Sequence, residues 1–509
     1  METELTLKVP PAALERIRSH PVLAERARGA PREHHLTDTW YDTPERELWK
    51  HGLTLRVRSN KDEQDSWIQI ARSVSAPQGR GAWESALPGG QPQPALLARQ
   101  VKSAALARLL ADEDIAARLQ PVFLSSIRRT TWDIVLPDGR QLACALDAGD
   151  LACGDRHAQL SELELALARG DPAELFALAL ALHQDIPLEL AGASLAARGH
   201  AMLADEPAPA VKAERIRLGS RMSLEDAFQR IGLSCLRQVE ANLPGVLRKD
   251  VESLHQMRVG LRRLRALLDM FAHLAAPPAE MLDSLDWLSG ELGAARDWDV
   301  LAGSTLDHAA DGTGCADGAD LAALRSAAQD KANGAHKQLL HTLHAPRTTL
   351  LMLQLGGWLR GRQWREGGAL PKNSALAARA TRGLRPLLRK AEQRLARRIA
   401  KLDPRDAPAR HRVRIAAKKA RYAAEFFHDL LPAKRTKRYT VRLAKLQDRL
   451  GVLNDFAVAD RLLDGLAAGH GQAPRQAAWA RGYLAAVGEA ESRRLDKPLR
   501  RVAKRRIAA

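Results

Sequence analysis

Short stretches of alternating apolar and polar residues dominate the first part of the chain. Because successive side chains of a strand point to opposite faces of a sheet, they predict strands at residues 53–58, 67–70, 131–136, 141–146 and 160–165. Pro137, Asp138 and Gly139 predict a hairpin turn. Helical spacing at residues 11–19, 95–110 and 172–182 predicts helices among these strands. We therefore expect an α+β unit over residues 1–204.

The pattern changes after residue 220. From there to the C-terminus apolar residues recur at helical spacing, with breaks at Pro277 and Pro278, in the Gly-rich segment 311–318, and near Pro371 and Pro404. A proline-interrupted polar stretch within residues 205–219 is typical of a linker. We expect an all-α domain over residues 220–500.

The helical part contains an internal repeat. The sequence HQMRVGLRRLR, which begins at His255, recurs as HRVRIAAKKAR from His411, and every basic position is kept. The sequence LGAARDW, from Leu292, is followed in the same order by LGVLNDF from Leu450. The repeat predicts two related helical bundles, at about residues 220–345 and 373–500.

The basic positions of each copy share a helix face. At about 100° per residue, His255, Arg258, Arg262 and Arg265 fall within a sector of about 80°. Cations three and four residues apart repel one another, so such a row does not stabilise its own helix. Guanidinium groups suit phosphate, because they offer several fixed donors. An anionic ligand is therefore expected at the two rows.

The alternative is a solvated row whose arginines pair with Asp297 or Asp455. The predicted binding residues are His255, Arg258, Arg262, Arg263, Arg265, His411, Arg414, Lys418, Lys419 and Arg421.

Charge is divided unevenly along the 509 residues. The formal net charge is +18, yet residues 1–200 hold 23 Lys and Arg against 27 Asp and Glu, a net charge of −4. Residues 201–509 hold 55 against 33, a net charge of +22. A field of one sign in one part of a chain indicates a polyanionic partner such as a phosphate polymer, nucleic acid or an anionic membrane surface.

Cysteine usage and hydropathy indicate the compartment. The four cysteines show no CxxC spacing, which argues against a zinc site or a disulfide framework. No run of about 18 uncharged apolar residues occurs. We expect a soluble cytoplasmic protein with no membrane partner, and the sequence gives no indication of its oligomeric state.

The duplicated basic helix and its LG-containing partner segment resemble the CHAD domain, a helical domain named for a conserved histidine. The resemblance covers about residues 220–500. It implies two pseudo-symmetric helical bundles around a basic channel that binds inorganic polyphosphate, and it implies association with polyphosphate granules.

Residues 1–204 resemble the CYTH domain, which has the triphosphate tunnel metalloenzyme fold and often precedes a CHAD domain. The resemblance rests on the opening ETE, the YDTP segment from Tyr41, the LRVR segment from Leu55, the ALDAGD segment from Ala145, the ELE segment from Glu162 and the SLAARG segment from Ser194. It implies an antiparallel β-barrel around a tunnel whose cations grip triphosphate and whose carboxylates hold Mg²⁺ or Mn²⁺. The implied metal ligands are Glu2, Glu4, Glu162 and Glu164, and the candidate catalytic residues are Glu4, Lys8, Arg56, Arg58, Arg129 and Arg198.

The chain departs from the CYTH pattern at several charged positions. Lysines expected from the resemblance are replaced by Thr6, Ala71, Ala152 and Leu195, and one acid is replaced by Ala82, whereas Glu84 is retained. Arg72, next to Ala71, is expected on the opposite face of its strand. Losing preorganised cations from a phosphoryl-transfer site costs orders of magnitude in rate. We expect weak triphosphatase activity or none.

Three functions therefore remain open. The main hypothesis is binding of inorganic polyphosphate by the helical domain, next to a degenerate barrel that still binds phosphate ends or serves as a scaffold. A working metal-dependent inorganic triphosphatase, with Lys8, Arg72 and Arg80 replacing the lost contacts, is the enzymatic alternative. Nucleic-acid binding is less favoured, because aromatics make up 4% of the chain and do not interleave with the basic rows. The basic segment 493–506 is either a further polyanion-binding arm or a solvated, frayed helix end.

Overall fold

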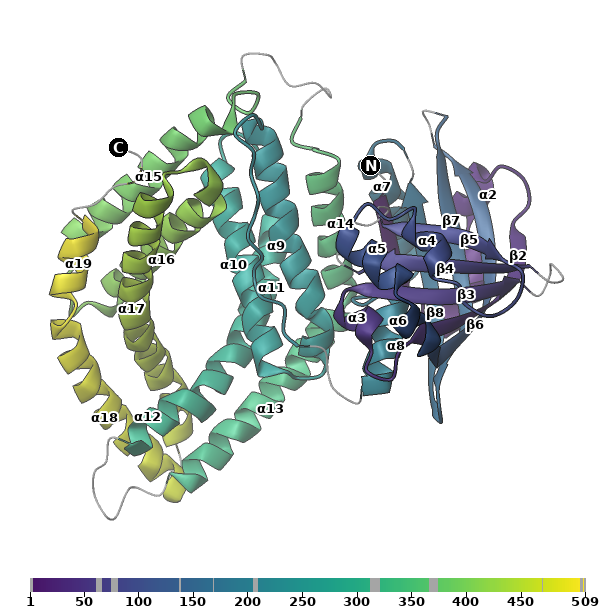
Figure 1. Cartoon of the computed structure of the whole chain (residues 1–509). Coiled ribbons are helices and arrows are strands. Elements are labelled where there is room, and N and C mark those ends of the chain that lie inside the picture. Colours follow the sequence, from purple (N-terminus) through teal and green to yellow (C-terminus); the bar gives the residue numbers. More distant parts are fainter. Residues whose placement is uncertain are drawn as a thin grey trace. The chain divides into compact units, whose positions relative to one another are not determined.

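The computed structural model describes residues 3–60, 66–74, 81–136, 139–167, 169–204, 209–311, 321–365, 374–468, 470–503 and 507. Two compact units emerge from its internal packing (Figure 1). Unit 1 comprises residues 1–209 and 352–361, and unit 2 comprises residues 210–351 and 362–509. No helix in the described part of the chain is long and apolar enough to cross a membrane.

Unit 1 is built on one antiparallel sheet of nine described strands in the order β5-β4-β3-β2-β6-β7-β8-β1-β9. The strands are β1 (Thr3–Lys8), β2 (Arg32–Asp42), β3 (Leu53–Asn60), β4 (Trp67–Ser73), β5 (Ala82–Leu87), β6 (Gln120–Val135), β7 (Gln141–Cys153), β8 (Arg156–Leu167) and β9 (Glu189–Leu190). Arg72 of β4 pairs with Glu4 of β1, near the other edge of the sheet. The sheet therefore curves, and the face that carries both side chains is its concave face.

Helices cover the convex face of this sheet. They are α1 (Leu14–Arg18), α2 (Pro21–Arg26), α3 (Glu47–Lys50), α4 (Ala95–Ala98), α5 (Ala104–Ala111), α6 (Glu113–Ala117) and α7 (Pro172–Asp185). One core joins Leu7, Leu146 and Leu165 of the strands to Leu175 and Leu178 of α7. A second core joins Leu55 and Ala71 to Leu97 and Leu110. Alternation in the strands thus buries apolar residues under helices and leaves the polar positions on the concave face.

The strand predictions are confirmed in β3, β4, β6, β7 and β8. The prediction of one continuous helix at residues 95–110 is wrong. It is divided into α4 and α5, and the hydroxyl of Ser103 accepts a hydrogen bond from the Leu106 amide at the start of α5. A side chain that caps a new helix competes with continuation of the old one. Pro137 and Asp138 of the predicted hairpin turn, residues 205–208 of the linker and most of the Gly-rich segment lie outside the described residues, as does the turn near Pro371.

Helices form most of the described part of unit 2. Its helices are α9 (Leu224–Leu247), α10 (Val251–Phe271), α11 (Ala279–Val300), α12 (Leu306–Asp311), α13 (Ala322–His344), α15 (Ala380–Ala400), α16 (Ala407–Phe426), α17 (Ala433–Ala467), α18 (Gln472–Arg493) and α19 (Asp496–Ala503), and α14 spans Pro346–Arg360. A short π-helix, Leu301–Thr305, bends the chain at Gly303 between α11 and α12.

The sequence repeat corresponds to a structural repeat. The first residues of α9 and α10, Leu224 and Val251, lie 156 positions before those of α15 and α16. The two copies meet where α9 and α15 begin: the Leu224 amide donates to the Ala378 carbonyl, and the Ala380 amide donates to the Met222 carbonyl. These two hydrogen bonds exchange under the same shift of 156, as a pseudo-twofold axis between the copies requires.

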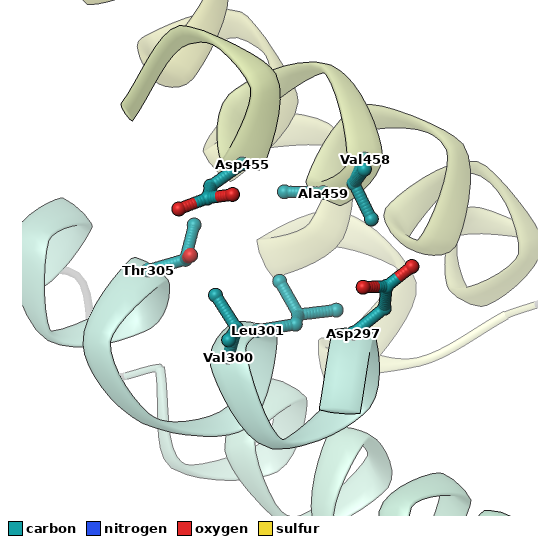
Figure 2. A pocket seen from close by; sticks show the side chains of 7 residues that line it. All are labelled: Asp297, Val300, Leu301, Thr305, Asp455, Val458 and Ala459. Carbon is teal, nitrogen blue, oxygen red and sulfur yellow. The ribbon is translucent and has the colours of Figure 1, made fainter. Parts of the chain in front are cut away.

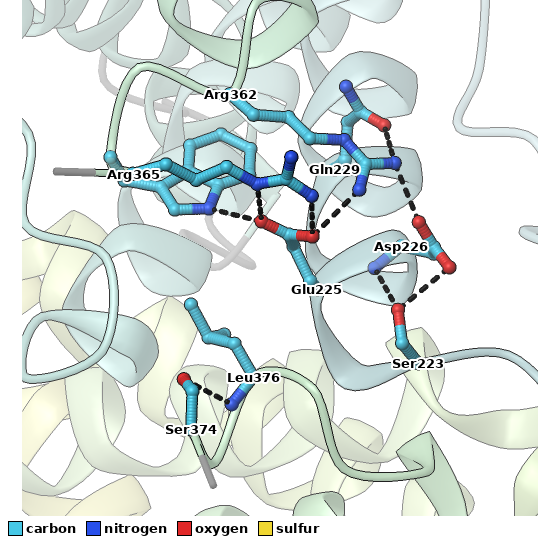
Figure 3. A network of polar contacts seen from close by, with 9 residues as sticks. Ser223, Glu225, Asp226, Gln229, Arg362, Arg365, Ser374 and Leu376 are labelled. Carbon is cyan, nitrogen blue, oxygen red and sulfur yellow. Dashed lines mark hydrogen bonds and ion pairs between the residues drawn. The ribbon is translucent and has the colours of Figure 1, made fainter. Parts of the chain in front are cut away.

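A polar network fixes the first turn of α9 (Figure 3). The Glu225 carboxylate, 3% exposed, accepts hydrogen bonds from Arg362 Nη1 at 2.7 Å, Trp364 Nε1 at 2.9 Å and Arg365 Nε at 2.7 Å. Burial alone would raise the pKa of Glu225, but these donors outweigh it and the pKa is lowered. The segment after α14 is thereby held to the start of the first repeat.

Candidate functional site

The register of the sheet decides which candidates share the concave face of unit 1. Arg56 pairs with Ile70 and Thr54 pairs with Arg72, so Arg72 lies on the same face as Arg56 and Arg58. The expectation that Arg72 faces the other way is therefore wrong. Ala71 belongs to the core under the helices instead. Ala152 lies on the opposite face from Asp147, so a lysine at that position would not reach the concave face.

The arginines of β3 are held by one buried acid. Asp38 of β2, whose side chain is 0% exposed, accepts from Arg58 Nε at 2.7 Å and Arg58 Nη2 at 2.8 Å, and lies 3.0 Å from Arg56 Nη1. Burial alone would raise the pKa of Asp38, but Arg56 and Arg58 outweigh it and the pKa is lowered. Burial lowers the pKa of Arg56 to about 10. Sequence reasoning missed Asp38, although the register opposite Arg58 would have identified it.

The remaining concave-face arginines are also paired. Arg129 donates to Asp147 through two hydrogen bonds, of 2.7 and 2.6 Å, and to Glu164 at 2.9 Å. Arg198 of α8 (Leu195–Ala204) donates to Glu162 at 2.6 Å. Each predicted catalytic arginine thus already has a carboxylate partner.

Acids accompany the cations throughout the described part of the concave face. Its cations include Lys8, Arg56, Arg58, Arg72, Arg129 and Arg198, and its acids include Glu4, Asp38, Glu84, Asp147, Glu162, Glu164 and Glu189. A triphosphate would have to displace a carboxylate from each arginine that it binds. Beyond Arg56, which lies 5.1 Å from the centroid of the Trp40 ring, the face becomes apolar.

The three described members of the predicted metal-ligand set are each bonded to an arginine. Carboxylate oxygens suit Mg²⁺ or Mn²⁺, but Glu4, Glu162 and Glu164 are each bonded to a different arginine. The described residues contain no group of three or more His, Cys, Asp or Glu side chains that could hold an ion. Glu2 and Arg80 lie outside the described residues.

In unit 2, cations from both repeats converge between α10, α11, α16 and α17. We call this set the inner cluster: His255, Arg258, Arg262, Arg296, His411, Arg414, Lys418 and Arg461, with Asp297 and Asp455. Six of the ten predicted binding residues belong to it. The sequence prediction did not include Arg296 and Arg461. Arg296 lies in the repeated LGAARDW segment, whereas Arg461 has no basic counterpart in the first repeat.

Backbone and neutral side chains position several members of the inner cluster. Arg258 donates to the Leu292 carbonyl at 3.0 Å, and a Cβ atom at Gly293 would lie 3.1 Å from its guanidinium. Arg262 donates to the Tyr422 hydroxyl at 2.9 Å, across the two repeats. These contacts orient cations without neutralising them.

The acids in the inner cluster are too few to compensate its cations. Burial lowers the pKa of Arg258 and Arg414, and burial with the neighbouring cations Arg262, Arg414 and Arg258 lowers the pKa of Lys418 to about 6. Burial likewise lowers the pKa of His255. The buried Nε of Arg414 has no hydrogen-bond partner among the described residues. Charges of one sign are therefore held together at an energetic cost.

Figure 2 shows the two acids on opposite sides of a small cavity. Asp297 and Asp455 line a small cavity of about 20 Å³, together with Thr305 and apolar side chains. Burial raises the pKa of both acids, although Arg258 and Arg414 act in the opposite direction. The acids thus moderate the positive field without cancelling it.

The other four predicted binding residues point elsewhere. Arg263 is buried, 5% exposed, and donates to Gln238 Oε1 at 2.9 Å. Arg265 pairs with Asp286, Lys419 with Asp269 at 2.8 Å, and Arg421 with Glu425 at 3.1 Å. The structure does not bring them into the inner cluster.

Comparisons with known proteins agree with this division of the chain. Family models match residues 1–199 as a CYTH domain and residues 230–464 as a CHAD domain. The crystal structure of the CHAD domain from the plant Ricinus communis is 36% identical, covers 59% of this chain and 98% of its own, and superposes with a TM-score of 0.51.

Two further relatives each match part of the chain. The inorganic triphosphatase of Haemophilus influenzae is 26% identical over 167 residues, which are 32% of this chain and 45% of that protein, so the match spans less than half of the relative. A Hippeastrum candidate adenylyl cyclase described as having a dominant triphosphatase activity is 18% identical, covers 40% of this chain and 96% of its own, and has a TM-score of 0.30. The chain thus belongs to the CHAD family, with a CYTH domain preceding its CHAD domain.

Proposed function

We propose that the helical unit binds linear inorganic polyphosphate at the inner cluster. The observation that carries the proposal is the convergence of basic side chains from both repeats, which outnumber the acids beside them among the described residues. A bound polyanion would relieve the repulsion between Arg258 and Arg414 and would favour the charged form of Lys418, so part of the cost of assembling the cluster returns as binding free energy.

The donor geometry supports a phosphate chain as the ligand. Arginine offers fixed, planar donors that match phosphate oxygens, and Arg258, Arg262 and Arg414 supply such donors in the inner cluster. The row from His255 to Arg262 spans seven residues, or about 10 Å of helix at about 1.5 Å per residue. A linear polymer with a charge on every unit can contact the whole row, and its pseudo-symmetric counterpart on α16, at once.

For unit 1 we propose weak triphosphatase activity or none. Every concave-face arginine is already bonded to a carboxylate, so triphosphate gains little net attraction there. The competing function is a metal-dependent inorganic triphosphatase, which is favoured by Glu4, Glu162 and Glu164 sharing one face. Phosphate release from triphosphate with Mg²⁺ or Mn²⁺ separates the two: turnover that Glu4→Ala abolishes would establish the enzyme.

Binding of labelled long-chain polyphosphate to the full chain tests the main proposal. Arg414→Gln should weaken binding, whereas Arg265→Gln, which removes an equal charge from a side chain paired with Asp286, should not. Equal effects of the two variants on affinity would show that the binding site lies elsewhere. Displacement of polyphosphate by single-stranded RNA at equal phosphate concentration would support a general nucleic-acid binder instead. Selective binding would also support association with polyphosphate granules.

A further inference from the structure

The two repeats of the helical unit differ sharply in charge. Residues 220–345 hold 13 Lys and Arg against 17 Asp and Glu, a net charge of −4. Residues 373–500 hold 30 against 12, a net charge of +18. The inner cluster draws cations from both repeats, so it does not account for this difference. The excess lies on other surfaces of the second repeat.

Most of the excess is carried by α15, α19 and the first half of α17. Helix α15 holds seven Lys and Arg, and its one acid, Glu392, is buried. Residues 433–449 of α17 hold seven more beside the single acid Asp448. The three helices share one core, in which Leu395, Leu443, Leu446, Leu495 and Leu499 are buried.

Helix α19 connects these surfaces. It packs against both α15 and α17, and Figure 1 shows it on the side of α17 turned away from α10 and α11. Leu495, Leu499 and Val502 are buried, so the described part of the basic C-terminal segment is a packed helix rather than a frayed end. Its cations Lys497, Arg500 and Arg501 are therefore held beside those of the other two helices.

Few acids on the protein neutralise this surface, which we call the outer face. Its exposed cations include Arg382, Arg389, Lys390, Arg397, Lys401, Lys434, Lys437, Arg438, Lys445, Lys497, Arg500 and Arg501. None of these twelve makes an ion pair with another residue that the structure describes. Cations at helical spacing repel one another, so a face of this composition is costly unless a counterion covers it.

We propose that the outer face is a second polyanion-binding surface, on which a long polyphosphate chain already held at the inner cluster continues. This inference rests on the proposed function of the inner cluster. The described exposed residues of α15 and α19 include no aromatic side chain, so the face offers no platform for base stacking. A phosphate chain without bases needs only cations. Two linked contacts would also raise the affinity for long chains over short ones.

Charge removal on each face tests the inference in the full chain. The outer variant is Arg389→Gln, Lys390→Gln and Arg397→Gln, and its matched control removes three exposed cations of the first repeat, Arg237→Gln, Lys331→Gln and Lys337→Gln. Labelled long-chain polyphosphate and tetraphosphate are titrated over a salt series. For a single-stranded polyanion each lost contact reduces the steepness of log K against log salt by about 0.7. With the long chain, the slope for the outer variant should therefore be shallower than that for wild type by about 2.

The outcomes are distinct. The inference expects weaker long-chain binding by the outer variant, unchanged tetraphosphate binding and an unaffected control. Long-chain binding that equals wild type in the outer variant would overturn it while leaving the inner cluster intact. If Arg414→Gln abolished binding of both the long chain and tetraphosphate while the outer variant bound both like wild type, binding would be confined to the inner cluster and the inference would be overturned. Displacement of the long chain by duplex DNA from wild type, but not from the outer variant, would make the outer face a nucleic-acid surface and overturn the inference.

Discussion

Lys418 gives the sharpest prediction about the inner cluster, because its protonation is linked to binding. Burial and the neighbouring Arg262, Arg414 and Arg258 lower its pKa from 10.5 to about 6. At about pH 9 the free side chain is therefore almost entirely neutral. A bound polyphosphate reverses the local field and raises the pKa, so binding at that pH takes up close to one proton at this residue.

The sign follows from the direction of the shift. Since the pKa of Lys418 is lower in the free protein than in the complex, affinity decreases as the pH rises above about 6, by up to about tenfold per pH unit from this group. Histidine side chains, with an ordinary pKa of about 6.5, contribute little at about pH 9. A test at this pH thus separates Lys418 from His255, whose pKa is lowered by burial.

Calorimetric titration with long-chain polyphosphate in two buffers of different ionisation enthalpy measures the proton uptake. Wild type should take up close to one proton more than Lys418→Arg, because arginine is already charged at this pH. The variant should still bind, which controls for loss of the site. Equal proton uptake by the two proteins would refute the reasoning, and so would binding by wild type with no uptake.

Three further substitutions test individual contacts. Asp38→Asn leaves two arginines of β3, each about one-fifth exposed, without a charged partner. We therefore expect urea titration to show that the free energy of unfolding falls by about 2–4 kcal/mol, and a fall of less than about 1 kcal/mol would contradict the pairing. Glu225→Gln should lower the free energy of unfolding by about 2–3 kcal/mol, with the effect shrinking below about pH 4.5 as the wild-type carboxyl protonates. Gly293→Ala should displace the Arg258 guanidinium and weaken polyphosphate binding by up to about tenfold with little change in the melting temperature; unchanged affinity would show that Arg258 is not positioned by this close approach.

Sequence patterns correctly predicted a β-rich first part followed by a helical part, and they predicted the helical repeat. The repeat was visible because α9, α10, α15 and α16 begin at the same shift that relates the two basic motifs. The strands of unit 1 were found wherever alternation was clean, and β2 was missed because its apolar run is interrupted by charged residues on the concave face. Local periodicity thus identified the helices and strands in which the buried residues form one regular face.

The sites were harder to predict, because they depend on register and on contacts between distant segments. A shift of one residue in the pairing of β3 and β4 would exchange the faces of Arg72 and Ala71. The sequence of β4 alone does not determine this register. The acid that holds Arg56 and Arg58 comes from another strand. Arg461 enters the inner cluster without any counterpart in the other repeat, so repetition gave no indication of it.

Binding of labelled long-chain polyphosphate to two full-chain variants, each of which replaces two basic side chains by glutamine, tests the central claim most directly. One variant is Arg414→Gln with Lys418→Gln in the inner cluster, and the other is Lys8→Gln with Arg72→Gln on the concave face of unit 1. We predict that the first pair weakens binding strongly and flattens its salt dependence, whereas the second pair leaves both unchanged. Weakened binding in the second variant, with wild-type binding in the first, would contradict the account and place the polyphosphate site in the CYTH domain.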